Sequence, residues 1–340
     1  MKRILSLLLA LALCVCALTT LTACSGTTIK VNPDKEKYVV GIIQLAPHDA
    51  LDAATQGFKD ALTEALAAQG RTVEFKFQNA QGDTNTCSTI VNSFIADDVD
   101  LIMANATAAL NAAYQATEVI PILGTSITEY GVALNLNSFN GTVGGNVSGT
   151  SDLAPLTTQA QMMIDTLSLE AGARVGLLYC SAEDNSVYQV TKVKEYLESK
   201  GMVCTEYKFS DSNDLAGVAQ NAASNSDAIY VPTDNTVASN TSIIDNICSP
   251  ANVPVFAGEE ATCLGCGYAT LSISYYNIGK KTGEMAAEVL LGQTSISEMP
   301  VAYDELPVKK YNKRNCDNLG IDTAALEQQG YIMIEGSDAE

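Results

Sequence analysis

Short apolar runs alternate with longer amphipathic stretches along most of the chain. Residues 38–45 form a nearly continuous apolar run, as in a strand that a parallel sheet buries on both faces. In residues 49–69 the apolar side chains recur every three or four positions, which predicts a helix that ends at Gly70. Such alternation of strands and helices predicts parallel sheets with helices on both faces and right-handed crossovers.

The same order of elements occurs twice. The first copy continues with expected helices at 83–95 and 106–117 and expected strands at 73–77, 99–103 and 120–123. The second copy has expected helices at 186–200 and 211–223 and expected strands at 174–179, 203–207, 227–231 and 253–256. This repeat is too long for a solenoid unit. It predicts an α/β fold of two similar, doubly wound parallel-sheet lobes whose loops face each other across a cleft.

The remaining segments predict how the two lobes are joined. A glycine- and serine-rich stretch at 141–152 lies between the copies and is interpreted as a crossover. A strand-like run at 268–275, an amphipathic helix at 277–291 and an extended segment at 300–311 follow the second copy, so we expect a hinge of several strands. The expected first lobe comprises residues 38–150 plus about 273–300, and the expected second lobe 151–272 plus about 301–334.

Residues 1–23 have the pattern of an export signal, with a basic start and an apolar run from Ile4 to Leu18. Leu21–Cys24 resembles the bacterial lipobox, which implies cleavage before Cys24 and a diacylglycerol on its sulfur. An uncleaved anchor helix would place the protein at the same membrane. Residues 24–37 are polar and aperiodic, which predicts a flexible tether, and the acidic tail 335–340 is expected to be disordered.

Charge and cysteine content exclude several classes of function. The formal net charge of −20 and the lack of a basic patch argue against nucleic-acid binding. The seven cysteines beyond Cys24 are scattered, and we expect mostly free thiols. The one CxxC motif, at 263–266, is interpreted as a loop that could close a small disulfide. A structural zinc site needs more ligands, and the sole histidine is distant in sequence, so no metal is expected.

The stretch 227–237 combines a buried strand with polar residues that follow it directly. Asp227–Val231 is apolar and β-branched, and the chain then breaks at Pro232. Asp234 therefore lies where the carboxyl end of a strand meets the start of a helix, the usual ligand position in open α/β sheets. Its carboxylate could hold an ammonium group, or it could cap the helix.

Catalytic motifs are missing from the sequence. It contains no G-x-S-x-G nucleophile elbow and no dinucleotide-binding glycine fingerprint, so neither an enzyme nor a bound cofactor is expected. His48 is the residue that could suggest catalysis. It follows a strand and precedes a helix, where it could equally donate to a ligand or cap the helix.

Six segments together resemble a known family, the substrate-binding lipoproteins of ABC transporters in the tryptophan/aromatic amino-acid group. These segments are Gly41–Leu45, His48–Asp52, Phe75–Gly82, Gly144–Asp152, Asp227–Val237 and Gly279–Ala286. The resemblance implies a type I periplasmic-binding fold that acts as a monomer. It further implies that a small ligand, an aromatic or apolar amino acid, is captured between the lobes and delivered to an ABC permease and its ATPase.

The resemblance also implies which residues contact the ligand. In the first lobe and the crossover they are His48, Thr107, Thr125, Ser126, Thr150, Ser151 and Asp152. In the second lobe they are Asn185, Ser186, Thr233, Asp234, Asn235 and Glu259. Two positions depart from the family pattern, because Pro47 stands where relatives often have Glu and Ser274 where Asp is common. Each departure removes a carboxylate near the cleft.

An amino-acid zwitterion needs two opposite kinds of partner. Hydroxyl groups and helix N-termini would hold its carboxylate. Asp234 and Glu259 are the expected partners of its ammonium group. Tyr268, Tyr188 or Phe139 could contact an aromatic side chain. Two alternatives stay open, namely the same fold binding a sugar or nucleoside, and a sensory receptor in which closure signals to a membrane partner.

Overall fold

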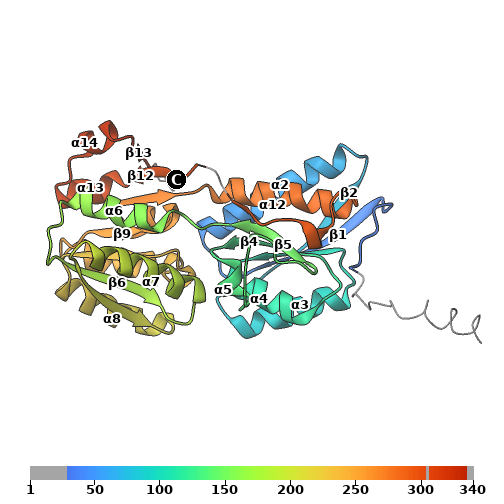
Figure 1. Cartoon of the computed structure of the whole chain (residues 1–340), viewed down its shortest axis with the longest axis horizontal. Coiled ribbons are helices and arrows are strands. Elements are labelled where there is room, and N and C mark those ends of the chain that lie inside the picture. The colour runs from blue at the N-terminus through green and yellow to red at the C-terminus, as the bar shows by residue number, and fades with distance from the viewer. Residues whose placement is uncertain (1–28, 304–305, 335–340) are drawn as a thin grey trace, which may run out of the picture.

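The structure is a computed structural model that describes residues 29–303 and 306–334 (Figure 1). Two lobes lie side by side along the long axis of the molecule. The export signal, the lipobox cysteine and the acidic tail predicted from the sequence fall outside the described residues. Within the described ranges, no helix is both long enough and apolar enough to cross a membrane.

The first lobe is built on a parallel six-stranded sheet in the order β11-β5-β4-β3-β1-β2. Its strands are β1 (Lys37–Gln44), β2 (Thr72–Asn79), β3 (Leu101–Asn105), β4 (Ile122–Ile127), β5 (Val147–Ser151) and β11 (Ala302–Tyr303). Its helices are α2 (Asp49–Ala67), α3 (Thr84–Ala96), α4 (Thr107–Ala116), α5 (Tyr130–Ala133), α12 (Tyr275–Leu290) and the 3₁₀ turn η1 (Ile296–Glu298). Two apolar clusters pack between this sheet and its helices.

The second lobe has a seven-stranded sheet in the order β13-β12-β10-β9-β8-β6-β7, in which only the β10–β12 pair is antiparallel. Its strands are β6 (Arg174–Cys180), β7 (Val203–Phe209), β8 (Ala228–Val231), β9 (Val255–Ala257), β10 (Ala269–Ser272), β12 (Val308–Tyr311) and β13 (Ile332–Met333). Its helices are α6 (Leu156–Leu167), α7 (Asp184–Ser199), α8 (Ser212–Asn225), α9 (Asn235–Ala238), α10 (Thr241–Cys248), α11 (Glu260–Cys266), α13 (Lys313–Leu319) and α14 (Thr323–Gln328). The predicted fold class of two doubly wound lobes is confirmed.

The described chain passes between the lobes after β5 and again between β10 and α12. Strands β11 and β12 also belong to different lobes, so they mark a third passage. After the second passage α12 packs closely along α2. A methyl group on Gly279 would lie 2.0 Å from the carbonyl oxygen of Ala54, so this approach needs glycine.

The joining segments differ from the prediction in two details. The expected strand at 268–275 ends early because Ser274 caps α12, accepting a hydrogen bond from the backbone N–H of Asn277 at 3.3 Å. The helix therefore starts at Tyr275. In addition, β11 pairs with β5 of the first lobe, although residues from 301 onward were expected in the second lobe.

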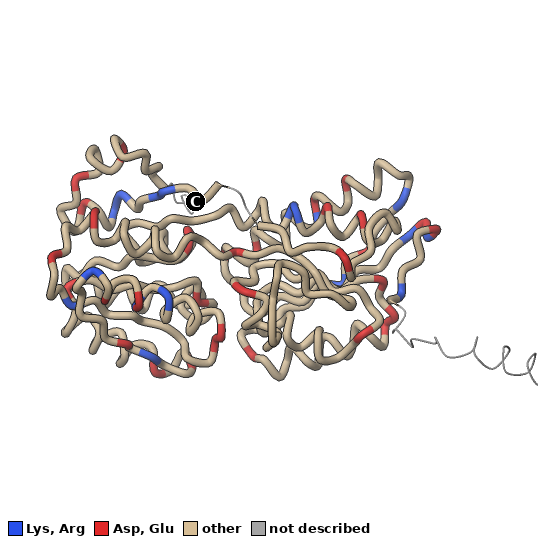
Figure 2. Tube along the Cα trace, viewed as in Figure 1, with Lys and Arg blue, Asp and Glu red and all other residues tan. Residues whose placement is uncertain are grey.

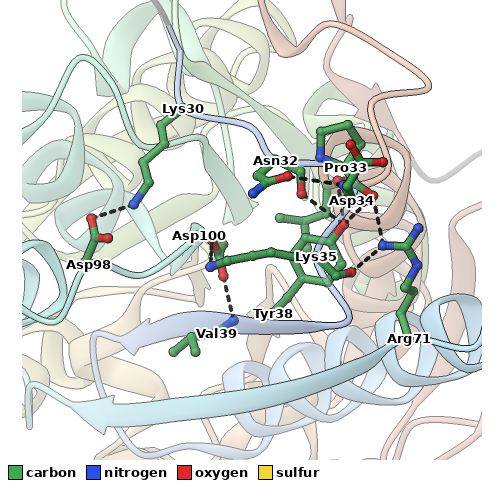
Figure 3. Close-up of polar contacts among 11 residues, drawn as sticks. Lys30, Asn32, Pro33, Asp34, Lys35, Tyr38, Val39, Arg71, Asp98 and Asp100 are labelled. Atoms are coloured by element: carbon green, nitrogen blue, oxygen red, sulfur yellow. Dashed lines mark hydrogen bonds and ion pairs between the residues drawn. The ribbon is translucent and has the colours of Figure 1, made fainter.

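Residues 29–36 are docked on the first lobe, which corrects the prediction of a flexible tether there (Figure 3). The hydroxyl of Tyr38 lies 3.2 Å from the carbonyl oxygens of Asn32 and Pro33 and 3.0 Å from that of Leu290. The guanidinium of Arg71 donates to the carbonyl oxygens of Pro33 and Lys35. The Lys35 ammonium pairs with Asp100, whose side chain is only 7% exposed. Arg71 and Asp100 lie far away in sequence, so local composition carries no sign of these two contacts.

The CxxC motif lies in helix α11 and not in a loop, which corrects its interpretation. Cys263 and Cys266 are both buried, free thiols. Burial raises the pKa of both thiols, which keeps them protonated and unreactive. Among the residues that the structure describes, no group of three or more His, Cys, Asp or Glu side chains is placed to hold a metal ion.

Charged side chains are distributed over both lobes. Figure 2 shows acidic residues on each lobe, with lysines and arginines placed among them. Several of these basic side chains are paired with carboxylates in the same lobe.

Replacing Lys35 by alanine is expected to lower the free energy of unfolding by about 1–3 kcal/mol, because the buried Asp100 carboxylate loses a charged partner. Denaturant unfolding measures the change. The matched control is Lys30→Ala, since Lys30 pairs with Asp98, which is 81% exposed, and the loss is expected to be much smaller because solvent screens an exposed pair. Equal losses in the two variants would contradict a structural role for the docked Lys35.

Candidate ligand-binding site

The two lobes touch through loops at the carboxyl ends of their strands. His48, between β1 and α2, lies with its Nε2 3.2 Å from Oδ1 of Asn235, the first residue of α9. Nearby, Nε2 of Gln189 lies 3.5 Å from Oγ1 of Thr128. These contacts join the lobes at the sheet edges where doubly wound folds bind ligands. The cleft is therefore closed in this structure.

A small enclosed cavity lies at this contact. Its volume is about 10 Å³, the room for roughly one water molecule. The predicted residues that line it are His48, Ser126, Asp152, Asn185, Thr233, Asp234, Asn235 and Glu259. Leu51, Thr128, Ala238 and Tyr275 also line it, and the sequence did not single them out.

A larger groove lies between the lobes beside this cavity. It has a volume of about 660 Å³ and shares Asn185 and Asn235 with the lining of the cavity. Thr107, at the start of α4, lines the groove and not the cavity. Small-molecule sites usually enclose about 300–1,000 Å³, so the groove has the size that the cavity lacks.

Three polar atoms around the cavity are buried without a hydrogen-bond partner among the described residues. They are Nδ1 of His48, Oγ of Ser126 and Oδ1 of Asp152. Buried polar atoms are nearly always paired, because an unpaired one loses its hydration without compensation. Ser126 also adopts a left-handed backbone conformation, with φ of 57°. Unpaired atoms and backbone strain in one place indicate a site prepared for a ligand.

Asp152 follows β5 directly, at the first passage between the lobes, and is 4% exposed. Its Oδ2 accepts a hydrogen bond from the Tyr275 hydroxyl at 2.8 Å, while Oδ1 has no partner. Burial raises the pKa of the Asp152 carboxyl, and the hydroxyl groups of Tyr275 and Thr128 oppose that shift. The unpaired oxygen makes Asp152 a natural partner for a cationic group.

Asp234 lines the cavity, but both of its carboxylate oxygens bond within the second lobe. Oδ1 accepts from the N–H of Val237 at 2.9 Å, which caps α9. Oδ2 accepts from the N–H of Cys180 at 2.7 Å and from the hydroxyl of Ser186 at 2.8 Å. Burial raises the pKa of Asp234, and the nearby charge of Glu183 adds to the shift. Asp234 was expected to be a ligand contact first and a helix cap second. The structure shows the cap and keeps Asp234 in the cavity lining, and its role as a ligand contact stays a prediction.

Glu259 repeats this pattern. Its carboxylate accepts from the N–H groups of Ala261 and Thr262 and so caps α11. Glu259 is 2% exposed and lines the cavity. The cavity lining thus contains three carboxylates and no lysine or arginine, which favours a ligand with a positive charge.

Several predicted residues lie close to the cavity without lining it. The hydroxyl of Thr150 lies 3.1 Å from that of Thr125 and 2.8 Å from that of Thr282, a buried chain inside the first lobe. The Ser151 hydroxyl donates to the carbonyl oxygen of Thr128 at 2.9 Å. Ser274, as described above, caps α12. These side chains make contacts within the protein, close to the cavity and to the segments that join the lobes.

Tyr268 does not lie in the cleft, which corrects its prediction as a ligand contact. It is fully buried in the second lobe, with its hydroxyl 2.6 Å from that of Thr166 and its ring packed edge-on against Phe256. Phe139 stacks on Tyr130 in the first lobe. Tyr275 is the aromatic side chain that lines the cavity. Tyr275 was the last residue of the strand predicted at 268–275, and that position gave no sign of this role.

Comparisons with known proteins agree with this geometry. The family model described as ABC transporter substrate binding protein matches residues 39–325. A tyrosine-binding protein of Clostridioides difficile (strain R20291) is 34% identical over 307 residues, which cover 88% of this chain and 87% of that protein.

Two solved structures bear on the closed cleft. An ABC domain from Streptococcus pneumoniae in complex with L-Trp is 29% identical and superposes with a TM-score of 0.80. The ligand-free, open structure of a substrate-binding protein with adhesive properties from Clostridium difficile is 33% identical, with a TM-score of 0.65. Each comparison covers 88% of this chain and all of the other. The lobes here thus resemble the complex more than the open form, despite lower identity. The chain belongs to the ABC transporter substrate-binding protein family.

Proposed function

We propose that this substrate-binding protein captures an aromatic amino acid between its lobes and delivers it to an ABC permease. The observation that carries the proposal is the set of unpaired polar atoms around the interlobe cavity, above all Oδ1 of Asp152. Two relatives that match most of the chain support the ligand class, one named for tyrosine and one solved with L-Trp.

The chemistry of the cavity suits an amino-acid zwitterion. Oδ1 of Asp152 accepts a hydrogen bond from the ammonium group, a charge-assisted bond in a buried place. The Ser126 hydroxyl has a proton to donate to the carboxylate. Leu51 and Tyr275 offer apolar and aromatic surface in the same lining. Asp152 thereby takes the role that the sequence had suggested for Asp234.

Binding requires the lobes to separate first. A cavity of about 10 Å³ does not admit an aromatic amino acid, and the groove beside it supplies the missing volume. The ligand docks while the cleft is open, and closure is then favoured because the ligand contacts both lobes at once. The three chain passages between the lobes are where the hinge bends.

The protein works outside the cytoplasm, as substrate-binding proteins of ABC importers do, and we propose that lipid on Cys24 holds it at the membrane. The docked segment, residues 29–36, lies at the end of the first lobe that faces away from the second (Figure 1). Residues 24–28 span at most about 18 Å when fully extended. A lipid on Cys24 would thus keep that end of the first lobe close to the membrane.

Titration with L-tryptophan is expected to give a saturable change in indole fluorescence. The chain contains no tryptophan, so all indole emission comes from the ligand. Tyrosine and phenylalanine should displace it, whereas glucose should not. Absence of any spectral change, together with no binding of tyrosine by calorimetry, would overturn the proposed ligand class.

The same titration with two variants shows which acid, Asp152 or Asp234, binds the ammonium group of the ligand. Asp152→Asn should weaken binding at least about 30-fold, because a buried ammonium loses its charged partner. Asp234→Asn keeps an acceptor oxygen for the cap and should weaken binding far less.

In the wild type, the affinity for the amino acid should fall as the pH is lowered through the raised pKa of Asp152, since a protonated carboxyl carries no charge. That pH dependence should weaken in Asp152→Asn, with the raised pKa of Asp234 accounting for what remains. A larger loss of affinity in Asp234→Asn would contradict the assignment.

Cell fractionation tests the lipid anchor. A Cys24→Ser variant should move from the membrane to the soluble exported fraction, because serine cannot carry the thioether-linked lipid. Wild-type protein analysed in parallel serves as the control. Retention of the variant in the membrane fraction would instead support an uncleaved anchor helix.

A further inference from the structure

Asn235 connects the two lobes and borders both the cavity and the groove. Its side-chain oxygen faces Nε2 of His48 in the first lobe at 3.2 Å. Its side-chain nitrogen donates to Oε2 of Glu183 in the second lobe at 2.7 Å. The backbone N–H of Asn235 donates to the same carboxylate oxygen at 3.0 Å. One amide group is thus held between a histidine and a carboxylate.

The Glu183 carboxylate fixes which way this amide points. Its other oxygen, Oε1, accepts from the N–H of Thr236 at 2.9 Å and from the Thr236 hydroxyl at 2.8 Å. An ionised carboxylate only accepts hydrogen bonds, so the Asn235 amide must turn its nitrogen toward Glu183. The amide oxygen then necessarily faces His48.

The direction of the amide determines where His48 carries its proton. Because Nε2 faces a carbonyl-type oxygen, Nε2 must carry hydrogen. A neutral imidazole has one N–H, so its Nδ1 is a bare acceptor. That Nδ1 atom is buried without a partner, and the ring does not cap α2. His48 also lines the cavity. The bare nitrogen is therefore free to accept a hydrogen bond from a ligand.

We propose that Glu183 is a positioning residue for ligand specificity. Acting through Asn235, Glu183 sets the tautomer of His48, so that the closed lobes present Nδ1 as an acceptor to an N–H or O–H donor of the ligand. Glu183 itself lines the groove and not the cavity. The tautomer of His48 therefore distinguishes its action through Asn235 from a direct contact with the ligand. This role rests on the proposed function for the ligand class, but the tautomer itself does not depend on which ligand binds.

The single histidine of the chain makes the tautomer directly measurable. With any affinity tag removed, nitrogen-15 NMR of labelled histidine reports one ring. Spectra are recorded on the protein alone and with saturating L-tryptophan or L-tyrosine. The wild type should show one tautomer with a protected Nε2–H proton. A wild-type ring with hydrogen on Nδ1, or one that exchanges freely between tautomers in all of these samples, would overturn the proposal.

Two variants interrupt the contacts that lead from Glu183 through Asn235 to His48. Glu183→Met removes both acceptor oxygens and should release the tautomer, weakening binding of the aromatic amino acid about tenfold or more. Asn235→Ala removes the amide itself and should have the same two effects, which covers the case in which Glu183→Met fails to fold. An unchanged His48 tautomer in either folded variant would overturn the proposal.

The matched control is Glu206→Met, on β7 of the same lobe. Glu206 bonds to Lys194 and Tyr179 and does not line the cavity, so its loss should leave both the His48 tautomer and the ligand affinity unchanged.

The same measurements distinguish failure of the proposed ligand class from failure of the proposed positioning role of Glu183. If no aromatic amino acid binds but the tautomer responds as expected, the ligand class is wrong and the positioning role stands. If the ligand binds but Glu183→Met keeps the wild-type tautomer, the positioning role is wrong.

Discussion

A buried carboxylate with one unpaired oxygen links the hinge to the binding site. Asp152 lies at the first passage between the lobes, and its hydrogen bond to Tyr275 ties it to the start of the helix after the second passage. Leaving its other oxygen buried and unpaired is unfavourable, because lost hydration is not replaced. A cationic group that arrives in the closed cleft removes this penalty. Closure and capture of a positively charged ligand are thus favoured by the same atom.

The other acids of the cleft have a structural task. Asp234 and Glu259 each follow a strand and accept N–H groups at the start of the next helix, as Asp83 and Asp211 do outside the cavity. A carboxylate is favourable there because the N-terminal N–H groups have no partner in the helix. An acid at a strand–helix junction is therefore weak support for ligand binding unless one of its oxygens is left unpaired.

The periodic pattern was enough to predict two doubly wound lobes, because apolar spacing reflects which faces are buried. Residues placed by contacts distant in sequence were not predictable in this way. The docking of residues 29–36 depends on Arg71 and Asp100, which lie more than 30 residues away in sequence, and nothing in the polar segment itself indicates it. Tyr268 illustrates the same limit, since an aromatic residue in a strand suits a core as well as a cleft. Which acid keeps an unpaired oxygen depends on hydrogen bonds that only the folded chain defines.

A crystal structure of the protein grown with L-tyrosine tests the central claim most directly. We expect the amino acid in the cleft, with its amino nitrogen at hydrogen-bond distance, about 2.7–3.2 Å, from Oδ1 of Asp152. An amino group bonded instead to Asp234 or Glu259, with Oδ1 of Asp152 still unpaired, would contradict the account.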